Sequence, residues 1–140
     1  MKKINYILIF VFYFTFPNLS AEINYFQKGK NLFTEKKYDQ AKFKFEQDLV
    51  FNPKNENSYL YLAKIFKLKN DNNQEESNLK TVILLNPKNE EAIYNLALLK
   101  IRKSNYSETK KLLDNFKKNC QNMCQKSDEL RDKLSSITKK

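Results

Sequence analysis

Two cysteines, Cys120 and Cys124, are the residues of this chain whose type and spacing most directly suggest chemistry. Two nearby thiols can form a disulfide, act as a redox pair or contribute to a metal site. A redox pair is disfavoured because the spacing is not Cys-x-x-Cys, and zinc is disfavoured because the chain has no histidine to complete a four-ligand site. We therefore predict a structural disulfide, with free or intermolecular thiols as the alternative.

Catalytic groups are sparse in this sequence. The chain lacks histidine, the commonest general base in enzymes, and its single glycine, Gly29, is incompatible with a glycine-rich phosphate loop. The acidic residues are spread along the chain, and we expect them on exposed helix faces rather than in an apolar neighbourhood. The sequence therefore predicts a protein with no enzymatic activity, no metal and no cofactor.

The elements that must position these residues are predicted to be helices. One glycine and three prolines in 140 residues disfavour a turn-rich β architecture. The length suits a single domain, and no linker rich in glycine, serine or proline divides it. The expected fold class is therefore all-α.

The first 21 residues differ in composition from the rest of the chain. Two lysines at the N-terminus precede an apolar run at 7–16, which Pro17 ends and the small residue Ala21 follows. This order is typical of a secretory signal peptide at 1–21, cleaved after about Ala21, and predicts a periplasmic or secreted protein. An uncleaved membrane anchor is the alternative, although a spanning helix needs roughly 20 apolar residues.

The chain is basic, with a formal net charge of +10 that becomes +8 when residues 1–21 are removed. Among the cationic residues only Arg102 and Arg131 carry the guanidinium group that suits bidentate recognition of phosphates and bases. Export would also separate the protein from intracellular nucleic acid. We therefore expect no nucleic-acid partner and interpret the charge as mostly a solvated surface, with peripheral membrane contact as an open alternative.

A repeat of 34 residues organises the chain. The segments FNPKNEN and LNPKNEE place Pro53 and Pro87 at this interval. Shifting the sequence by 34 residues aligns large side chains with large ones and small with small in three copies, which indicates a stack of similar units. The column of small residues, where two helices can approach closely, consists of Gly29, Ala63 and Ala97.

These columns resemble the tetratricopeptide repeat (TPR) family, whose repeat is a pair of helices with characteristic large, small and aromatic positions and a proline after the second helix. The matching residues are Tyr25, Gly29, Tyr38, Ala41, Phe45 and Pro53 in the first copy, Tyr59, Leu62, Ala63, Phe66, Leu79 and Pro87 in the second, and Leu96, Ala97, Tyr106 and Leu113 in the third. Glu75 and Thr109 depart from the usual alanine, and the third copy lacks the proline. The resemblance implies an α-α superhelix (solenoid) of three helical hairpins, at about 22–55, 56–89 and 90–123, within a domain at 22–140.

Seven helices are expected, at about 22–35, 38–51, 56–69, 73–85, 90–102, 106–119 and 126–138. Capping signals for helix starts occur at Asn55, at Asn89, at Asn73 with Glu76, and at Asn105 with Glu108. The last helix has an apolar stripe and a charged face, and we expect it to cap the open end of the solenoid.

The cysteines lie where the third inter-repeat turn is expected. The segment CQNMC replaces the NPKNE of the two earlier turns, so this turn has two cysteines and no proline. We expect the disulfide to close the turn and to hold the capping helix, which would stabilise the fold by on the order of 2 kcal/mol. The turn must bend, because a wholly helical segment holds the two Cα atoms near the upper limit for a disulfide.

Binding is the function that the resemblance implies, since the first helices of TPR repeats line a concave groove that usually takes an extended peptide or a helix. The corresponding positions of this chain form three rows: Phe26, Leu60 and Tyr94; Lys30, Lys64 and Leu98; and Phe33, Lys67 and Ile101. Such a surface suits a ligand with apolar side chains and some negative charge. The alternative is that several of these residues only pack between neighbouring repeats.

The resulting hypothesis is a non-catalytic scaffold or adaptor of the bacterial cell envelope that binds another protein or peptide. The TPR clamp of lysine, asparagine and arginine for a C-terminal carboxylate is not matched, because Phe26, Tyr61 and Glu91 occupy positions where the clamp needs lysine or asparagine. A membrane-associated structural or accessory subunit, held by its basic surface or by an uncleaved anchor, is the alternative.

Overall fold

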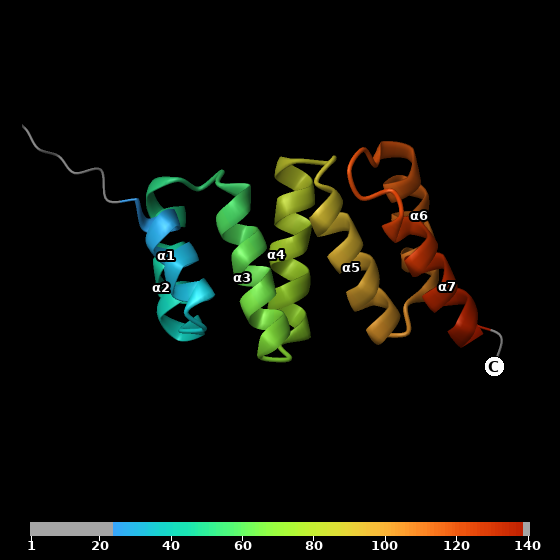
Figure 1. Cartoon of the computed structure of the whole chain (residues 1–140), viewed down its shortest axis with the longest axis horizontal. Coiled ribbons are helices and arrows are strands. Elements are labelled where there is room, and N and C mark those ends of the chain that lie inside the picture. Colours follow the sequence, from blue (N-terminus) through green and yellow to red (C-terminus); the bar gives the residue numbers. More distant parts are fainter. Residues whose placement is uncertain (1–23, 139–140) are drawn as a thin grey trace, which may run out of the picture.

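The computed structural model describes residues 24–138 as α-helices arranged in one row (Figure 1). They are α1 (Tyr25–Thr34), α2 (Tyr38–Phe51), α3 (Glu56–Leu68), α4 (Asn72–Leu85), α5 (Glu90–Arg102), α6 (Tyr106–Asn119) and α7 (Lys126–Thr138). Residues 24–138 contain no strand, and the predicted all-α fold of three hairpins and a final helix is confirmed. The predicted signal peptide lies outside the described residues, so cleavage after Ala21 stays a prediction.

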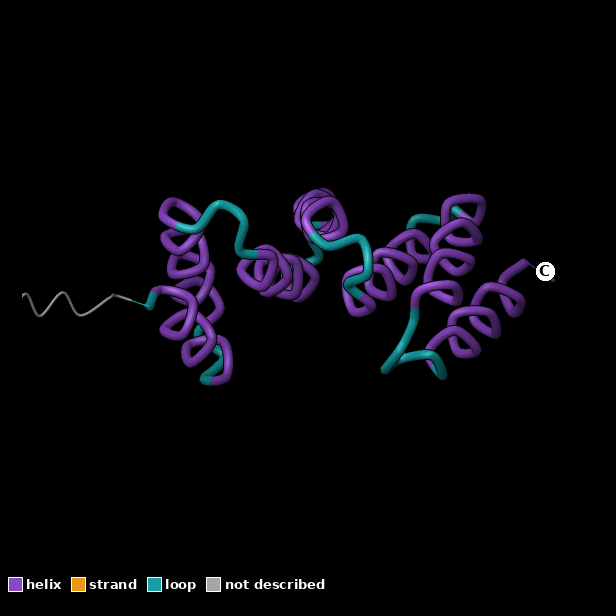
Figure 2. The backbone as a smooth tube through the Cα atoms, turned by 90° about the horizontal axis from the view of Figure 1, so that it is seen from above, coloured by secondary structure: helices purple, strands orange, loops and turns teal. Residues whose placement is uncertain are grey.

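The row twists along its length. In Figure 2 the helices at its middle, α3 and α4, are seen nearly end-on, whereas the helices at its two ends are seen obliquely. The direction of the helices therefore changes from one hairpin to the next, as in a superhelix.

A small residue in the first helix of each repeat allows the second helix to pack closely against it. A Cβ atom on Gly29 would lie 2.7 Å from Cε1 of Phe45, which is fully buried. Later repeats have a larger residue in the first helix and a smaller one in the second, so the total volume changes little. The equivalent pairs are Ala63 with Leu79 and Ala97 with Leu113.

The core consists of three apolar clusters, each of which joins a hairpin to the first helix of the next one. The first lies between α1, α2 and α3, the second centres on α3, α4 and α5, and the third lies between α5, α6 and α7. Leu130 places α7 in the third cluster, where a fourth repeat would otherwise start. Each hairpin therefore buries its apolar face only by stacking, and α7 completes the last one.

Asparagine or aspartate side chains accept a backbone N–H at the starts of five helices. The capping roles predicted for Asn55, Asn89 and Asn105 are confirmed. The prediction for Asn73 is wrong, because α4 starts earlier and Asp71 accepts from the backbone N–H of Gln74. A carboxylate is favoured there because its charge also interacts with the helix dipole.

The turns within the three hairpins share a left-handed residue. Lys36, Asn70 and Ser104 have φ values of 61°, 59° and 56° and follow one another at the repeat interval. Asparagine tolerates this conformation better than lysine or serine does. The backbone of the turn therefore repeats even where its residue type does not.

The third inter-repeat turn is closed by the predicted disulfide between Cys120 and Cys124, whose Cα atoms lie 5.2 Å apart. The chain leaves the helical conformation here, as that bond requires. Glu90 at the start of α5 accepts the backbone N–H groups of Gln121 and Met123, each at 2.6 Å. These contacts tie the turn to the third hairpin.

Candidate binding site

The first predicted row packs between neighbouring repeats. The ring of Phe26 meets the ring of Tyr61 from α3 edge-on, at a centroid distance of 5.8 Å. Leu60 is only 5% exposed and lies in the second core cluster. The side chains of this row are therefore engaged with the next repeat, as the packing alternative expects.

The capping helix and the third core cluster partly bury the last residue of each row. The hydroxyl of Tyr94 donates to Glu129 of α7 at 2.8 Å, and burial together with this hydrogen bond raises the pKa of Tyr94 to about 12. Leu98 and Ile101 pack against the third core cluster, which includes Leu130. Tyr94, Leu98 and Ile101 are therefore half-buried, and part of each side chain stays on the surface.

The remaining predicted residues lie on α1 and α3. Phe33 meets the ring of Tyr61 at 5.1 Å between centroids and is half-buried. Lys30 and Lys67 are exposed, and Lys64 is half-buried. Lys30 and Lys67 are thus the most accessible members of the predicted groove.

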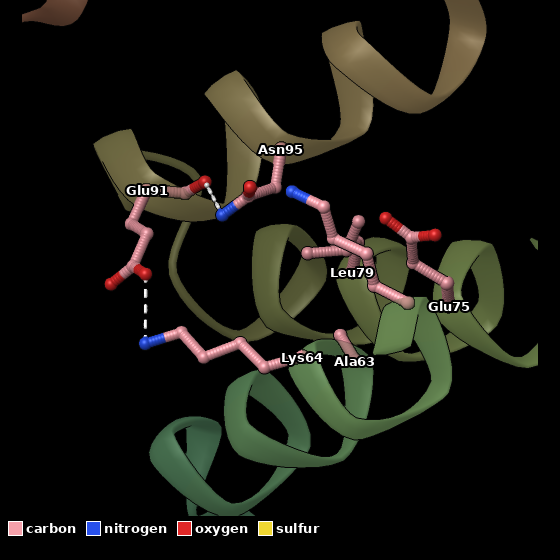
Figure 3. Close-up of a pocket in the computed structure, with 7 residues that line it drawn as sticks. Ala63, Lys64, Glu75, Leu79, Glu91 and Asn95 are labelled. Carbon is pink, nitrogen blue, oxygen red and sulfur yellow. Dashed lines mark hydrogen bonds and ion pairs between the residues drawn. The ribbon is translucent and has the colours of Figure 1, made fainter. Parts of the chain in front are cut away.

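Lys64 and Lys67 line a pocket of about 220 Å³ between α3, α4 and α5 (Figure 3). Its other polar and apolar walls come from Glu75 and Leu79 of α4 and from Glu91 and Asn95 of α5. The pocket thus joins the second repeat to the first helix of the third. Sequence reasoning placed Lys64 and Lys67 together but did not include the residues of α4.

The mouth of the pocket is held by polar contacts. The ammonium group of Lys64 lies 2.8 Å from Oε1 of Glu91, and it lies over the ring of Tyr61 at 4.7 Å from the centroid. The side-chain nitrogen of Asn95 donates to the backbone carbonyl of Glu91 at 2.9 Å. Lys67 has no ion-pair partner among residues 24–138, so it carries an uncompensated charge at this site.

The buried wall of the pocket contains a carboxylate that sequence reasoning missed. Glu75 is 1% exposed, and its Oε2 accepts from Nη2 of Arg102 at 2.5 Å. Its Oε1 is the one buried side-chain oxygen or nitrogen of the described residues without a hydrogen-bond partner. The expectation that the acidic residues lie on exposed faces is wrong here, because stacking of the hairpins brings Arg102 to Glu75 and encloses both oxygens.

The solved structures with a similar fold identify the architecture around this pocket. The Yersinia enterocolitica type III secretion chaperone SycD, in complex with a peptide of the translocator YopD, matches with a TM-score of 0.73 and 14% identity over 84% of this chain and 92% of that one. The first TPR of Spaghetti (RPAP3), bound to an HSP90 peptide, matches with a TM-score of 0.71 and 19% identity over 81% and 93%. No family model and no curated protein sequence matches the chain.

This chain has the tetratricopeptide repeat fold. A third TPR structure, the complex of the TPR2B domain of yeast Sti1 with pHsp70, supports the same assignment, with a TM-score of 0.72 and 17% identity over 79% of this chain and 93% of that one. Glu75 occupies the position of the TPR repeat at which the first copy has Ala41 and the third has Thr109, both fully buried. That departure was the one sequence signal for the carboxylate.

A second buried acid, Asp48, also contradicts the expectation of exposed carboxylates, since it is 3% exposed. Its Oδ2 accepts from the hydroxyl of Ser58 and from the side-chain amide of Asn55, both at 2.6 Å. Its Oδ1 accepts from Asn52 at 3.1 Å. Asp48 is therefore a satisfied anchor of the first inter-repeat turn, unlike Glu75.

An ion-pair network ties α4, α5 and α6 together away from the pocket. Lys100 is 4% exposed, and its ammonium group lies 2.7 Å from Glu76 and 2.8 Å from Glu108. Lys103 and Lys80 also contact Glu76, and hydrogen bonds from the three lysines lower the pKa of Glu76 to about 2. The partners of these charges are all supplied within the TPR solenoid.

Two further features of residues 24–138 bear on function. They contain no group of three or more side chains suited to hold a metal ion. Their helices are also too short or too polar to cross a lipid bilayer.

Proposed function

We propose that this TPR protein is a non-catalytic scaffold or adaptor that binds a protein or peptide along the first helices of its repeats. The observation that carries the proposal is the pocket between α3, α4 and α5, where Lys64, Lys67 and Asn95 surround an accessible space of about 220 Å³. The peptide complexes of the chaperone SycD and of the first TPR of Spaghetti, whose fold this chain shares, support the proposal.

The chemistry of the proposed partner follows from the charges of this surface. Lys30 and Lys67 are exposed, whereas Phe26, Leu60 and Tyr94 are engaged in packing between repeats or with the cap. A ligand with acidic residues would therefore be attracted to the lysines. Leu60 is buried and the other predicted apolar positions are half-buried, so apolar anchoring is limited to the parts of these side chains that stay exposed.

The proposed setting is the bacterial cell envelope, with the protein periplasmic or secreted after cleavage near Ala21. The basic and apolar composition of residues 1–21 supports export. The disulfide between Cys120 and Cys124 supports the same setting, because disulfides persist in oxidising compartments.

The proposal is tested by capturing the tagged protein from crosslinked cells, identifying the partner by mass spectrometry and measuring its affinity by isothermal titration. The double substitution Lys64→Ala with Lys67→Ala is expected to weaken binding by about tenfold or more, as loss of charged contacts commonly does. Substitution of Phe26 or Tyr94 is less informative, because both residues stabilise the stack.

The matched control removes two other lysines, Lys110 and Lys111, which are exposed on α6. It changes the net charge by the same amount and leaves the pocket intact. A specific groove requires that this control keep full affinity, and an equal loss in both double variants would contradict binding at the pocket.

A membrane-associated accessory subunit is the second candidate, and the basic net charge of +10 favours it. Vesicles with anionic lipid test this candidate, because electrostatic adsorption falls steeply as salt rises. Equal losses of vesicle binding in the two double-lysine variants, without any protein partner, would replace the adaptor by this second function.

A further inference from the structure

One oxygen of the Glu75 carboxylate is buried and lacks a hydrogen-bond partner among the described residues. Oε2 of this carboxylate is paired with Arg102, whereas Oε1 is buried and has no hydrogen-bond partner among the described residues. Leaving a buried acceptor without a donor costs free energy, so a donor that enters the pocket would be bound favourably.

The TPR fold does not itself require a carboxylate at this position. The equivalent residue is Ala41 in the first repeat, and in the third it is Thr109, whose hydroxyl donates to the backbone carbonyl of Asn105 at 2.9 Å. Both residues are fully buried without an unmet polar group. The unmet acceptor is therefore particular to the second repeat, which is the repeat that forms the pocket.

The carboxylate faces the pocket from its α4 side. Figure 3 shows the side chain of Glu75 rising from α4 toward α5, the helix that carries Glu91 and Asn95. Lys67, an exposed residue of α3, belongs to the same lining. The site therefore combines a buried hydrogen-bond acceptor with an accessible hydrogen-bond donor.

The charges around the pocket select among possible ligand groups. Glu75 is neutralised by Arg102 and Glu91 by Lys64, so Lys67 contributes the uncompensated charge of the lining. A ligand ammonium or guanidinium would add a second uncompensated positive charge beside Lys67 and Arg102. A ligand carboxylate has no proton to donate to Glu75. A neutral group that both donates and accepts hydrogen bonds can pair with Oε1 of Glu75 and with the ammonium group of Lys67.

We propose that this pocket binds the carboxamide side chain of an asparagine or glutamine in the partner peptide. The amide nitrogen donates to Oε1 of Glu75, and the amide oxygen accepts from the ammonium group of Lys67. This inference rests on the proposed peptide-binding function and names the side chain that its pocket recognises.

The test is a titration of the isotope-labelled protein with N-acetylglutaminamide, followed by NMR at the backbone amides of Glu75 and Asn95. N-acetyllysinamide and the amide of N-acetylglutamate are the matched probes. The glutamine probe is expected to give saturable shifts at these two amides, with each of the other probes at least tenfold weaker.

Two variants show whether the contact is specific. Glu75→Ala is expected to weaken binding of the glutamine probe by at least tenfold. The variant should keep the helical circular dichroism of the unchanged protein, since the first repeat has alanine at this position. Glu46→Ala removes the same charge from an exposed position of α2 and is expected to bind as the unchanged protein does.

Three outcomes would overturn the inference. Equal or tighter binding of the lysine probe would make the pocket a cation site. Absence of saturable shifts for all three probes would mean that Lys67 or water meets the acceptor. A captured partner could lose binding to the Lys64→Ala, Lys67→Ala double variant and still bind Glu75→Ala with unchanged affinity. That result would leave the proposed function intact and remove this inference alone. Absence of any captured partner would refute the proposed function itself.

Discussion

Glu75 and Arg102 form a pair of unequal exposure. The carboxylate is 1% exposed, whereas the arginine side chain is 39% exposed. A buried charge is tolerated only when it is paired, and removing the exposed arginine leaves the buried carboxylate without a partner. The pair therefore holds α4 to the C-terminal end of α5 only as long as the arginine is present.

We predict that Arg102→Ala lowers the free energy of unfolding by about 2 kcal/mol, less than for a fully buried pair because water reaches the arginine. Glu75→Ala is expected to be neutral or stabilising, and the double variant should recover most of the loss. Urea unfolding followed by circular dichroism measures all three. A loss in Glu75→Ala as large as that in Arg102→Ala would show that the pair is itself stabilising.

The helical hairpins depend on matched sizes of facing residues. The close contact of Gly29 with Phe45 contrasts with the later repeats, where an alanine meets a leucine. The small residue of the first helix and the large residue of the second helix therefore vary together from repeat to repeat. Changing one of the two without the other is expected to disturb their packing.

We predict that Gly29→Ala destabilises the protein by about 1 kcal/mol. Overlap of the new methyl group with the Phe45 ring costs about 1–3 kcal/mol, and the better helix propensity of alanine offsets about 1 kcal/mol of it. Adding Phe45→Leu should relieve the overlap and restore the melting temperature toward the unchanged protein. If the double variant melts below Gly29→Ala alone, the two positions are not coupled as the packing suggests.

Across the whole molecule, acidic side chains link separate helices and make the stack sensitive to acid. Lys100, Lys103 and Lys80 hold the pKa of Glu76 at about 2, against 4.5 for an ordinary glutamate. At the other end, Lys126, Lys133 and Tyr94 lower the pKa of Glu129 to about 2 as well. Between about pH 4.5 and pH 2, both carboxylates therefore stay charged in the folded protein, whereas the same carboxylates are protonated in the unfolded chain.

We predict that stability is nearly constant between about pH 5 and pH 9 and falls as the pH drops from about 4.5 toward 2. The sign follows because a carboxylate with a lowered pKa stabilises the fold above its unfolded pKa and loses that contribution on protonation. The loss attributable to Glu76 is on the order of 2 kcal/mol after allowance for solvent screening. Thermal unfolding from pH 7 to pH 2 measures it.

The matched variant for this prediction is Glu76→Gln, which cannot titrate. Its stability at neutral pH should be lower than that of the unchanged protein. Its stability should also fall less steeply between about pH 4.5 and pH 2. If the stability of the two proteins falls equally steeply below about pH 4.5, the pH dependence comes from other carboxylates.

The helices and their order were predictable from the sequence because the signals for them are local. The small column at Gly29, Ala63 and Ala97, the prolines at the repeat interval and the asparagine caps each act within a turn or a hairpin. The two cysteines replaced an inter-repeat turn, so the position of the disulfide followed from the repeat register and its pairing from the chain having only two cysteines. Even so, local signals were ambiguous at the start of α4, where three successive residues can cap.

The candidate site was decided by tertiary structure, because its contacts join different repeats. Stacking brought Arg102 to Glu75 and Tyr94 to Glu129, and it enclosed Leu60. Whether a side chain on a first helix faces a ligand or the next repeat depends on how closely the repeats approach, and a period of 34 residues does not specify that distance. The sequence by itself determined the TPR helices and their order, whereas only their stacking determined that a buried carboxylate and two lysines share one pocket.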